Sequence, residues 1–165
     1  MHTGPVIIGF DGTPAAERAI HEAADLLAAR GAQPPRDALV VFVWDAGSAF
    51  EAVTLPEQAL EFVSVDVSTA LKAEKAASED AQQLAERGAA LARDAGFRAE
   101  GQAVAHDLTV AETLVKLARE VDAQAVVVGL REHHGLARLA PGKTLPGLLH
   151  TAPCPVVACG AANPS

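Results

Sequence analysis

The fold is decided by one stretch near the start of the chain, Val6-Ile7-Ile8-Gly9-Phe10-Asp11-Gly12-Thr13-Pro14. Its run of β-branched and apolar residues predicts a strand that is buried on both faces. Thr13 offers an N-cap oxygen, and Pro14 suits the first position of a helix. A buried strand that passes through a tight turn into a helix is the opening unit of a parallel α/β sheet.

Strand and helix patterns alternate through the rest of the chain. Strands are predicted at 6–10, 39–44, 98–105, 124–130 and 155–159, with helical spacing of apolar residues between them. Right-handed crossovers would join these elements into an α/β, doubly wound sandwich: a five-stranded parallel sheet with helices on both faces. We expect one domain over residues 1–160 and a short tail at 161–165. Within 45–68, the pattern allows a short helix or a strand fragment.

Composition and charge exclude several classes of protein. Half of the 165 residues are hydrophobic, which is enough for a real core, and the net charge of −8 argues against nucleic acid and anionic membranes as partners. The chain has no apolar run of the roughly 18 residues that a membrane helix needs, and its first residues lack a signal-peptide pattern. Two cysteines cannot form a disulfide framework. We therefore expect a cytoplasmic protein with reduced thiols.

Two of the predicted strands end in residues suited to ligand binding. The first strand runs through Gly9 to Asp11, and the fourth ends at Gly129. Ligands of open parallel sheets lie at the carboxyl ends of the strands, where the strand order reverses. Asp11 has two interpretations, which stay open at this point: an Asx turn that only shapes the chain, or a carboxylate that holds a ribose or a base.

The loop after Gly129 concentrates positive charge in an acidic protein. It carries Arg131 and Lys143, and Gly142 precedes a short helix predicted at 144–150. Backbone N–H groups at a helix N-terminus favour an anion. The loop is therefore either an anion-binding segment or a solvated basic loop.

Other chemistries lack a required residue. A phosphatase of the DxDGT type needs its nucleophilic aspartate where this chain has Gly9. The P-loop-like sequence that ends at Thr144 does not follow a strand, and Pro141 removes one backbone donor. His133 and His134 have no metal-ligand spacing, so no metal site is predicted. We expect no catalytic residues and no dedicated enzyme, although slow ATP hydrolysis stays open.

Three stretches together make the chain resemble the universal stress protein family. They are residues 6–19 with the Asp-Gly-Thr turn, residues 125–131 with the fourth strand, and the closing Ala152-Pro153-Cys154-Pro155-Val156-Val157. The resemblance covers nearly the whole chain. It implies the strand order 3-2-1-4-5 and a homodimer joined through the last strand, from Pro155 to Cys159.

The resemblance also implies a stress-response module that binds an adenine nucleotide: ATP, AMP or cyclic AMP, with magnesium only alongside the nucleotide. Asp11 would contact the ribose and Val43 the adenine. The remaining site residues, which would surround the phosphates or shape the strand ends, are Gly9, Gly129, Arg131, Gly142, Lys143 and Thr144.

Two residues depart from the phosphate loop of the ATP-binding members. Their pattern is Gly-x-x-Gly, nine residues, then Gly-Ser/Thr, whereas this chain has Glu132 at the second glycine and Lys143 at the hydroxyl residue. A carboxylate at the former position would repel phosphate. The alternative is therefore a dimeric interaction module of the same family that binds no nucleotide and acts through a protein partner.

Overall fold

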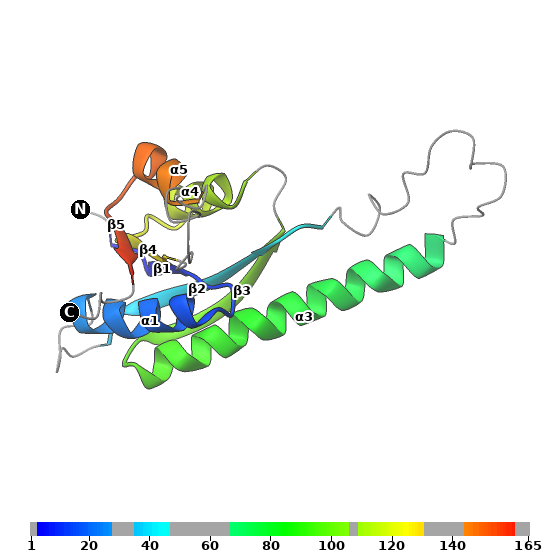
Figure 1. The fold of residues 1–165 in the computed structure, drawn as a ribbon, viewed down its shortest axis with the longest axis horizontal. Coiled ribbons are helices and arrows are strands. Elements are labelled where there is room, and N and C mark those ends of the chain that lie inside the picture. The colour runs from blue at the N-terminus through cyan, green and yellow to red at the C-terminus, as the bar shows by residue number, and fades with distance from the viewer. Residues whose placement is uncertain (1–2, 28–34, 47–66, 106–108, 131–143, 161–165) are drawn as a thin grey trace, which may run out of the picture.

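The computed structural model describes residues 3–27, 35–46, 67–105, 109–130 and 144–160. The strands and helices follow each other along the chain as the sequence predicts (Figure 1). In chain order they are β1 (Val6–Gly9), α1 (Pro14–Leu27), β2 (Asp37–Trp44), α3 (Val67–Asp94), β3 (Arg98–Ala105), α4 (Val110–Glu120), β4 (Ala125–Gly129), α5 (Thr144–Thr151) and β5 (Val156–Cys159). Among these described parts, no helix is long and apolar enough to cross a membrane.

The five strands form one parallel sheet in the order β3-β2-β1-β4-β5, as predicted. β1 lies between β2 and β4, with Gly9 opposite Val41 on one side and Val128 on the other. The chain thus leaves β1 toward one side of the sheet and later returns to its other side. This is the point where the strand order reverses.

Helices cover both faces of the sheet (Figure 1). Alternate residues of β1 enter opposite layers, because successive side chains of a strand point to opposite faces. Val6 and Ile8 pack with α1 and α3, whereas Ile7 packs with α4 and Leu148 of α5. All three β1 side chains are fully buried. A strand buried on both faces has no polar position, which is why its sequence reads as a continuous apolar run.

The helix α3 is much longer than the sheet it covers. Its 28 residues span about 42 Å. The second half packs on the sheet through Ala81, Ala85, Ala89 and Ala92, and nearly all residues from Leu71 to Asp80 are exposed. In Figure 1 this first half extends past the end of the sheet.

The observed boundaries differ slightly from the predicted ones. β2 begins at Asp37, two residues before the predicted start, because the polar Asp37 and the small Ala38 pair with Arg98 and Ala99 of β3. β5 begins at Val156 rather than Pro155, whose carbonyl still accepts a hydrogen bond from Val126 N–H. The predicted short helix or strand fragment within 45–68 and the tail 161–165 lie mostly outside the described residues.

Candidate functional site

The predicted ligand edge is formed by the carboxyl ends of β1 and β4. The two strands are parallel neighbours, and Gly9 lies one residue out of step with Gly129 in their register. Their following turns therefore leave the same edge of the sheet, at the reversal of strand order where ligands of open α/β sheets bind.

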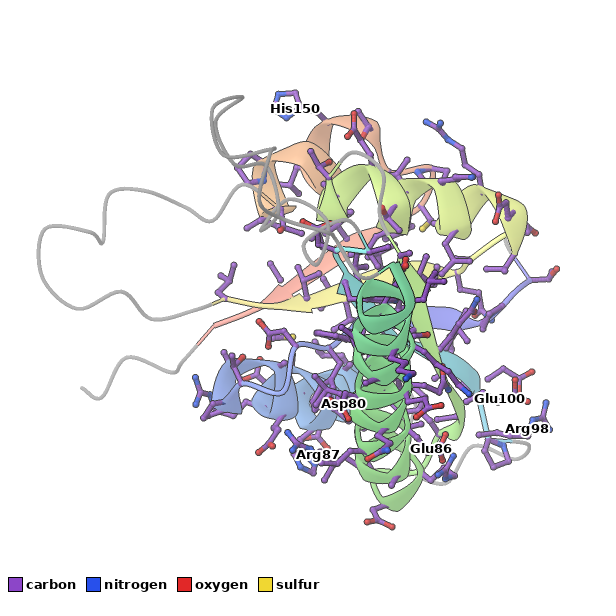
Figure 2. All side chains as sticks on the ribbon, turned by 90° about the vertical axis from the view of Figure 1, so that its right-hand side faces the viewer. Asp80, Glu86, Arg87, Arg98, Glu100 and His150 are labelled. Atoms are coloured by element: carbon purple, nitrogen blue, oxygen red, sulfur yellow. The ribbon has the colours of Figure 1, made fainter. Side chains whose placement is uncertain are left out.

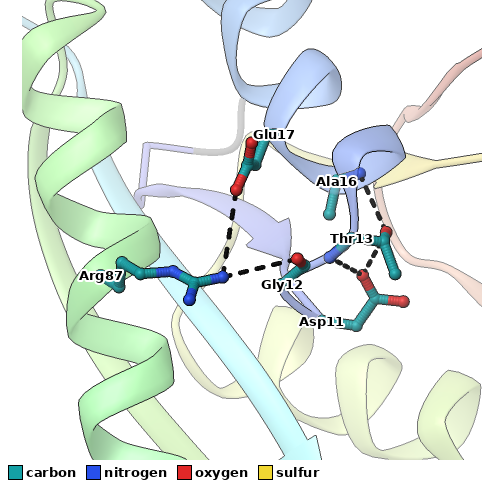
Figure 3. Close-up of polar contacts among 6 residues, drawn as sticks. All are labelled: Asp11, Gly12, Thr13, Ala16, Glu17 and Arg87. Atoms are coloured by element: carbon teal, nitrogen blue, oxygen red, sulfur yellow. Dashed lines mark hydrogen bonds and ion pairs between the residues drawn. The ribbon is translucent and has the colours of Figure 1, made fainter.

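Asp11 forms an Asx turn at this edge (Figure 3). Its Oδ1 accepts a hydrogen bond from Thr13 N–H at 3.0 Å and another from the Thr13 hydroxyl at 2.6 Å. Thr13 Oγ1 in turn accepts from Ala16 N–H at 3.3 Å, which caps the start of α1. The structural interpretation of Asp11 is thus confirmed. Its half-buried carboxylate is also fixed in place at the strand end.

Arg87 of α3 contacts this turn from the opposite side (Figure 3). Its guanidinium donates to the Gly12 carbonyl at 3.4 Å and lies 3.9 Å from the Glu17 carboxylate. It also lies 5.9 Å from the centre of the Phe10 ring. The β1–α1 turn is therefore held both by its own side chains and by a cation from a distant helix. The sequence does not single out Arg87, because it is one of several charged residues along the exposed face of a long helix.

The lack of a side chain at Gly129 has a structural cause. A Cβ at this position would lie 2.5 Å from the carbonyl oxygen of Ala15, in the first turn of α1. Close approach of α1 therefore requires a glycine here, in addition to any ligand that approaches the strand end. Gly9 and Val43 lie near the carboxyl ends of β1 and β2. The Val43 side chain is partly buried and packs in the layer between the sheet and α4.

Thr144 begins α5, beside a cavity of about 650 Å³ between α4 and α5. The lining residues described by the structure are Thr109, Val110, Ala111, Glu112, Thr144, Pro146, Gly147, His150 and Thr151. Thr144 is the one predicted site residue among them. Arg131, Gly142 and Lys143, together with Glu132, lie outside the described residues.

The α4 end of this cavity carries a capping box, formed by Thr109 and Glu112 at the start of the helix. Thr109 Oγ1 accepts from Glu112 N–H at 3.2 Å, and the Thr109 hydroxyl donates to the Glu112 carboxylate at 2.7 Å. The two polar side chains therefore satisfy each other at the helix start. These two hydrogen bonds explain why Thr109 and Glu112 lie together at the helix start, without any bound ligand.

Both cysteines are free thiols, and Cys159 is buried in the layer between the sheet and α1. Burial, and after it the nearby Glu22 carboxyl, together raise the pKa of the Cys159 thiol to about 11. Burial, followed by the charge of Asp122, also raises the pKa of Cys154. A protonated thiol is a poor nucleophile, so packing is the role that the geometry supports. Within the residues described, no three His, Cys, Asp or Glu side chains come together as metal ligands.

A parallel sheet with the strand order β3-β2-β1-β4-β5 and helices on both faces defines an open, doubly wound α/β protein. The chain belongs to the universal stress protein family, whose model matches residues 3–160. No curated protein matches the sequence.

Solved structures of low sequence identity share the fold. One is the hypothetical protein MJ0577, whose biochemical function was assigned from its structure: 14% identity, TM-score 0.72, coverage of 99% of this chain and 100% of that one. A universal stress protein from Archaeoglobus fulgidus in complex with dAMP has 19% identity and a TM-score of 0.61, with 96% and 99% covered. A family protein from Arabidopsis thaliana with AMP bound has 12% identity and a TM-score of 0.60, with 97% and 93% covered.

Proposed function

We propose that this chain is a stress-response module that binds an adenine nucleotide at the carboxyl ends of β1 and β4. The observation that carries the proposal is the Asp11 turn, which sits at the reversal of strand order with its carboxylate fixed by Thr13. Two relatives of the same fold were crystallised with AMP and dAMP.

Different residues would contact different parts of the nucleotide. Asp11 would accept hydrogen bonds from ribose hydroxyls, and the partly buried Val43 would contact the adenine ring. Backbone N–H groups from Gly129 and Gly142 to Thr144, with the side chains of Arg131 and Lys143, would surround the phosphates. Gly9 would keep the strand end open. The module binds rather than transforms its ligand, and magnesium would enter only with a polyphosphate.

Calorimetry tests this proposal directly. ATP, ADP, AMP and cyclic AMP are titrated in turn into protein that has been stripped of co-purified nucleotide. Saturable heat with at least one of them supports the proposal and identifies the ligand. Flat traces with all four, from folded protein, refute it.

A second function is favoured by Glu132 and Lys143. Their departure from the phosphate-loop pattern fits a dimeric interaction module that binds no nucleotide. The double substitution Glu132→Gly with Lys143→Ser restores the pattern, so it should create or raise ATP affinity if the loop is the determinant. An unchanged trace would assign the loss to another part of the site.

We also propose that the protein forms a homodimer through the outer edge of β5 and that it is cytoplasmic. Val126 and Leu130 donate to the carbonyls of Pro155 and Cys159, so these residues direct their backbone toward β4. Ala158 then directs its backbone outward, and its side chain is exposed. Two copies could pair their β5 strands about a twofold axis.

A further inference from the structure

The second edge of the sheet, β3, is covered by side chains from α3. An edge strand normally exposes a row of N–H and C=O groups that another chain can pair with. Arg98 N–H donates to Arg36 on the β2 side, so the backbone of the odd-numbered residues points outward. Hydrogen bonds from α3 reach three of these outward groups.

Gln82 makes two of the three bonds. Its side-chain amide donates to the Gly101 carbonyl at 2.8 Å, and its Oε1 accepts from Ala103 N–H at 2.9 Å. In a parallel sheet, the N–H and C=O of one residue in the neighbouring strand make the same pair of bonds, to the carbonyl of one residue and to the N–H two residues further on. The Gln82 carboxamide therefore takes the place of the N–H and C=O of one residue in a sixth strand.

Arg93 extends this cover along the strand. One of its guanidinium nitrogens donates to the Ala99 carbonyl at 2.8 Å, one alternate position before Gly101. Gln82 and Arg93 lie eleven residues apart, which is close to three helical turns, so both leave α3 on the same side.

The close approach of α3 to β3 depends on Gly101. A Cβ at Gly101 would lie 2.6 Å from the backbone carbonyl of Ala85. In Figure 2, which looks along α3, Glu86 lies on the β3 side and Arg87 on the α1 side. Gln82 precedes Glu86 by four residues and so shares its side of the helix.

We infer that β3 is a latent surface for strand addition by a second copy of this chain, and that Gln82 keeps it closed. The occupant is a second copy because every molecule carries the same edge, and identical strands can pair antiparallel about a twofold axis. Strand addition at β3 requires neither a bound nucleotide nor self-association of β5.

The test compares Gln82→Ala and Gln82→Asn with the wild type and with Gln83→Ala. The asparagine keeps the carboxamide but is one methylene too short for both bonds, and Gln83 is the exposed neighbour on the same helix. Amide hydrogen exchange at Ala103 and light-scattering mass over a concentration series are measured, with circular dichroism to confirm folding. An Ala158→Pro background in every protein removes association through β5.

Both Gln82 variants should exchange the Ala103 amide roughly tenfold faster than the wild type. They should also form species of at least twice the mass at concentrations where the wild type and Gln83→Ala do not. Unchanged exchange at Ala103 would show that the bond is not made. Faster exchange without any increase in mass would show that Gln82 does not keep the edge closed. Either result overturns the inference.

Discussion

Asp11 and Thr13 are joined by two hydrogen bonds to one oxygen: Asp11 Oδ1 accepts from the backbone N–H and from the hydroxyl of Thr13. This arrangement gives the carboxylate a structural role before any ligand arrives. It also holds that carboxylate at the edge where β1 and β4 end side by side. The structural and the ligand-binding roles of Asp11 can be separated by substitution.

Asp11→Asn should leave stability unchanged and lower nucleotide affinity roughly tenfold. The asparagine oxygen can still accept from Thr13, but the charge-assisted bonds to the ribose are lost. Asp11→Ala should lower affinity and also lower the free energy of unfolding by about 1 kcal/mol, because the turn loses its acceptor. Calorimetry and urea unfolding measure the two effects, with the distant, exposed Asp80→Asn as control. Wild-type affinity in Asp11→Asn would confine Asp11 to the turn.

Arg87→Ala should lower the free energy of unfolding by about 1 kcal/mol. The change removes an exposed ion pair with Glu17 and a cation–π contact with Phe10, each of which contributes less than that. The ion-pair part should disappear in 1 M salt, because its charges are exposed. A Glu17→Ala partner in a double-mutant cycle isolates the pair. Additive effects of the two single changes would mean that Arg87 acts without Glu17.

Ala158→Pro should convert a β5-linked dimer to a monomer without unfolding it. Proline has no N–H. Because Pro155 and Cys159 are the residues whose backbone points toward β4, the N–H that is lost at position 158 points away from β4, and the sheet is preserved. Light scattering measures the mass and circular dichroism the fold. Ala105→Pro, at the last residue of the opposite edge strand, is the matched control. A folded Ala158→Pro that keeps the wild-type dimer mass would rule out the β5 interface.

Stability should fall as the pH rises from about 9 to about 11, because of Cys159. Its pKa is raised to about 11 in the fold, above the usual thiol value, so the unfolded chain loses its proton first. The contribution is complete below pH 9 and is lost as the pH passes through the folded pKa. Cys159→Ala should flatten this part of the curve of unfolding free energy against pH, apart from the cost of its smaller side chain. Parallel curves would show that the thiol does not titrate in this range.

Most of the strands were predictable because each is a local apolar run between turn residues, whereas β3 is a more polar strand with a weaker local signal. The start of α4 was predictable for a similar reason, since the Thr109–Glu112 capping box is a local pattern that needs no tertiary context. The strand order came from the resemblance carried by the three motifs, and the structure confirms it.

The contacts between distant elements were not predictable. Arg87 and Gln82 are ordinary polar residues of a helix, and their partners at Gly12 and Gly101 depend on how α3 crosses the sheet. Gly129, in contrast, could be singled out from the sequence, but the group that lies against it could not be predicted. The sequence suggested close approach by a ligand, and the structure shows close approach by Ala15. A glycine in the sequence indicates that another group lies close to the backbone, but it does not identify that group.

The most direct test of the proposed function is an NMR titration of isotope-labelled protein with AMP. We expect saturable shifts of the amide signals at the ends of β1 and β4, at Asp11 and Gly129, with small changes elsewhere in the sheet. Shifts confined to the cavity between α4 and α5, or no shifts at millimolar AMP, would contradict a nucleotide site at this edge.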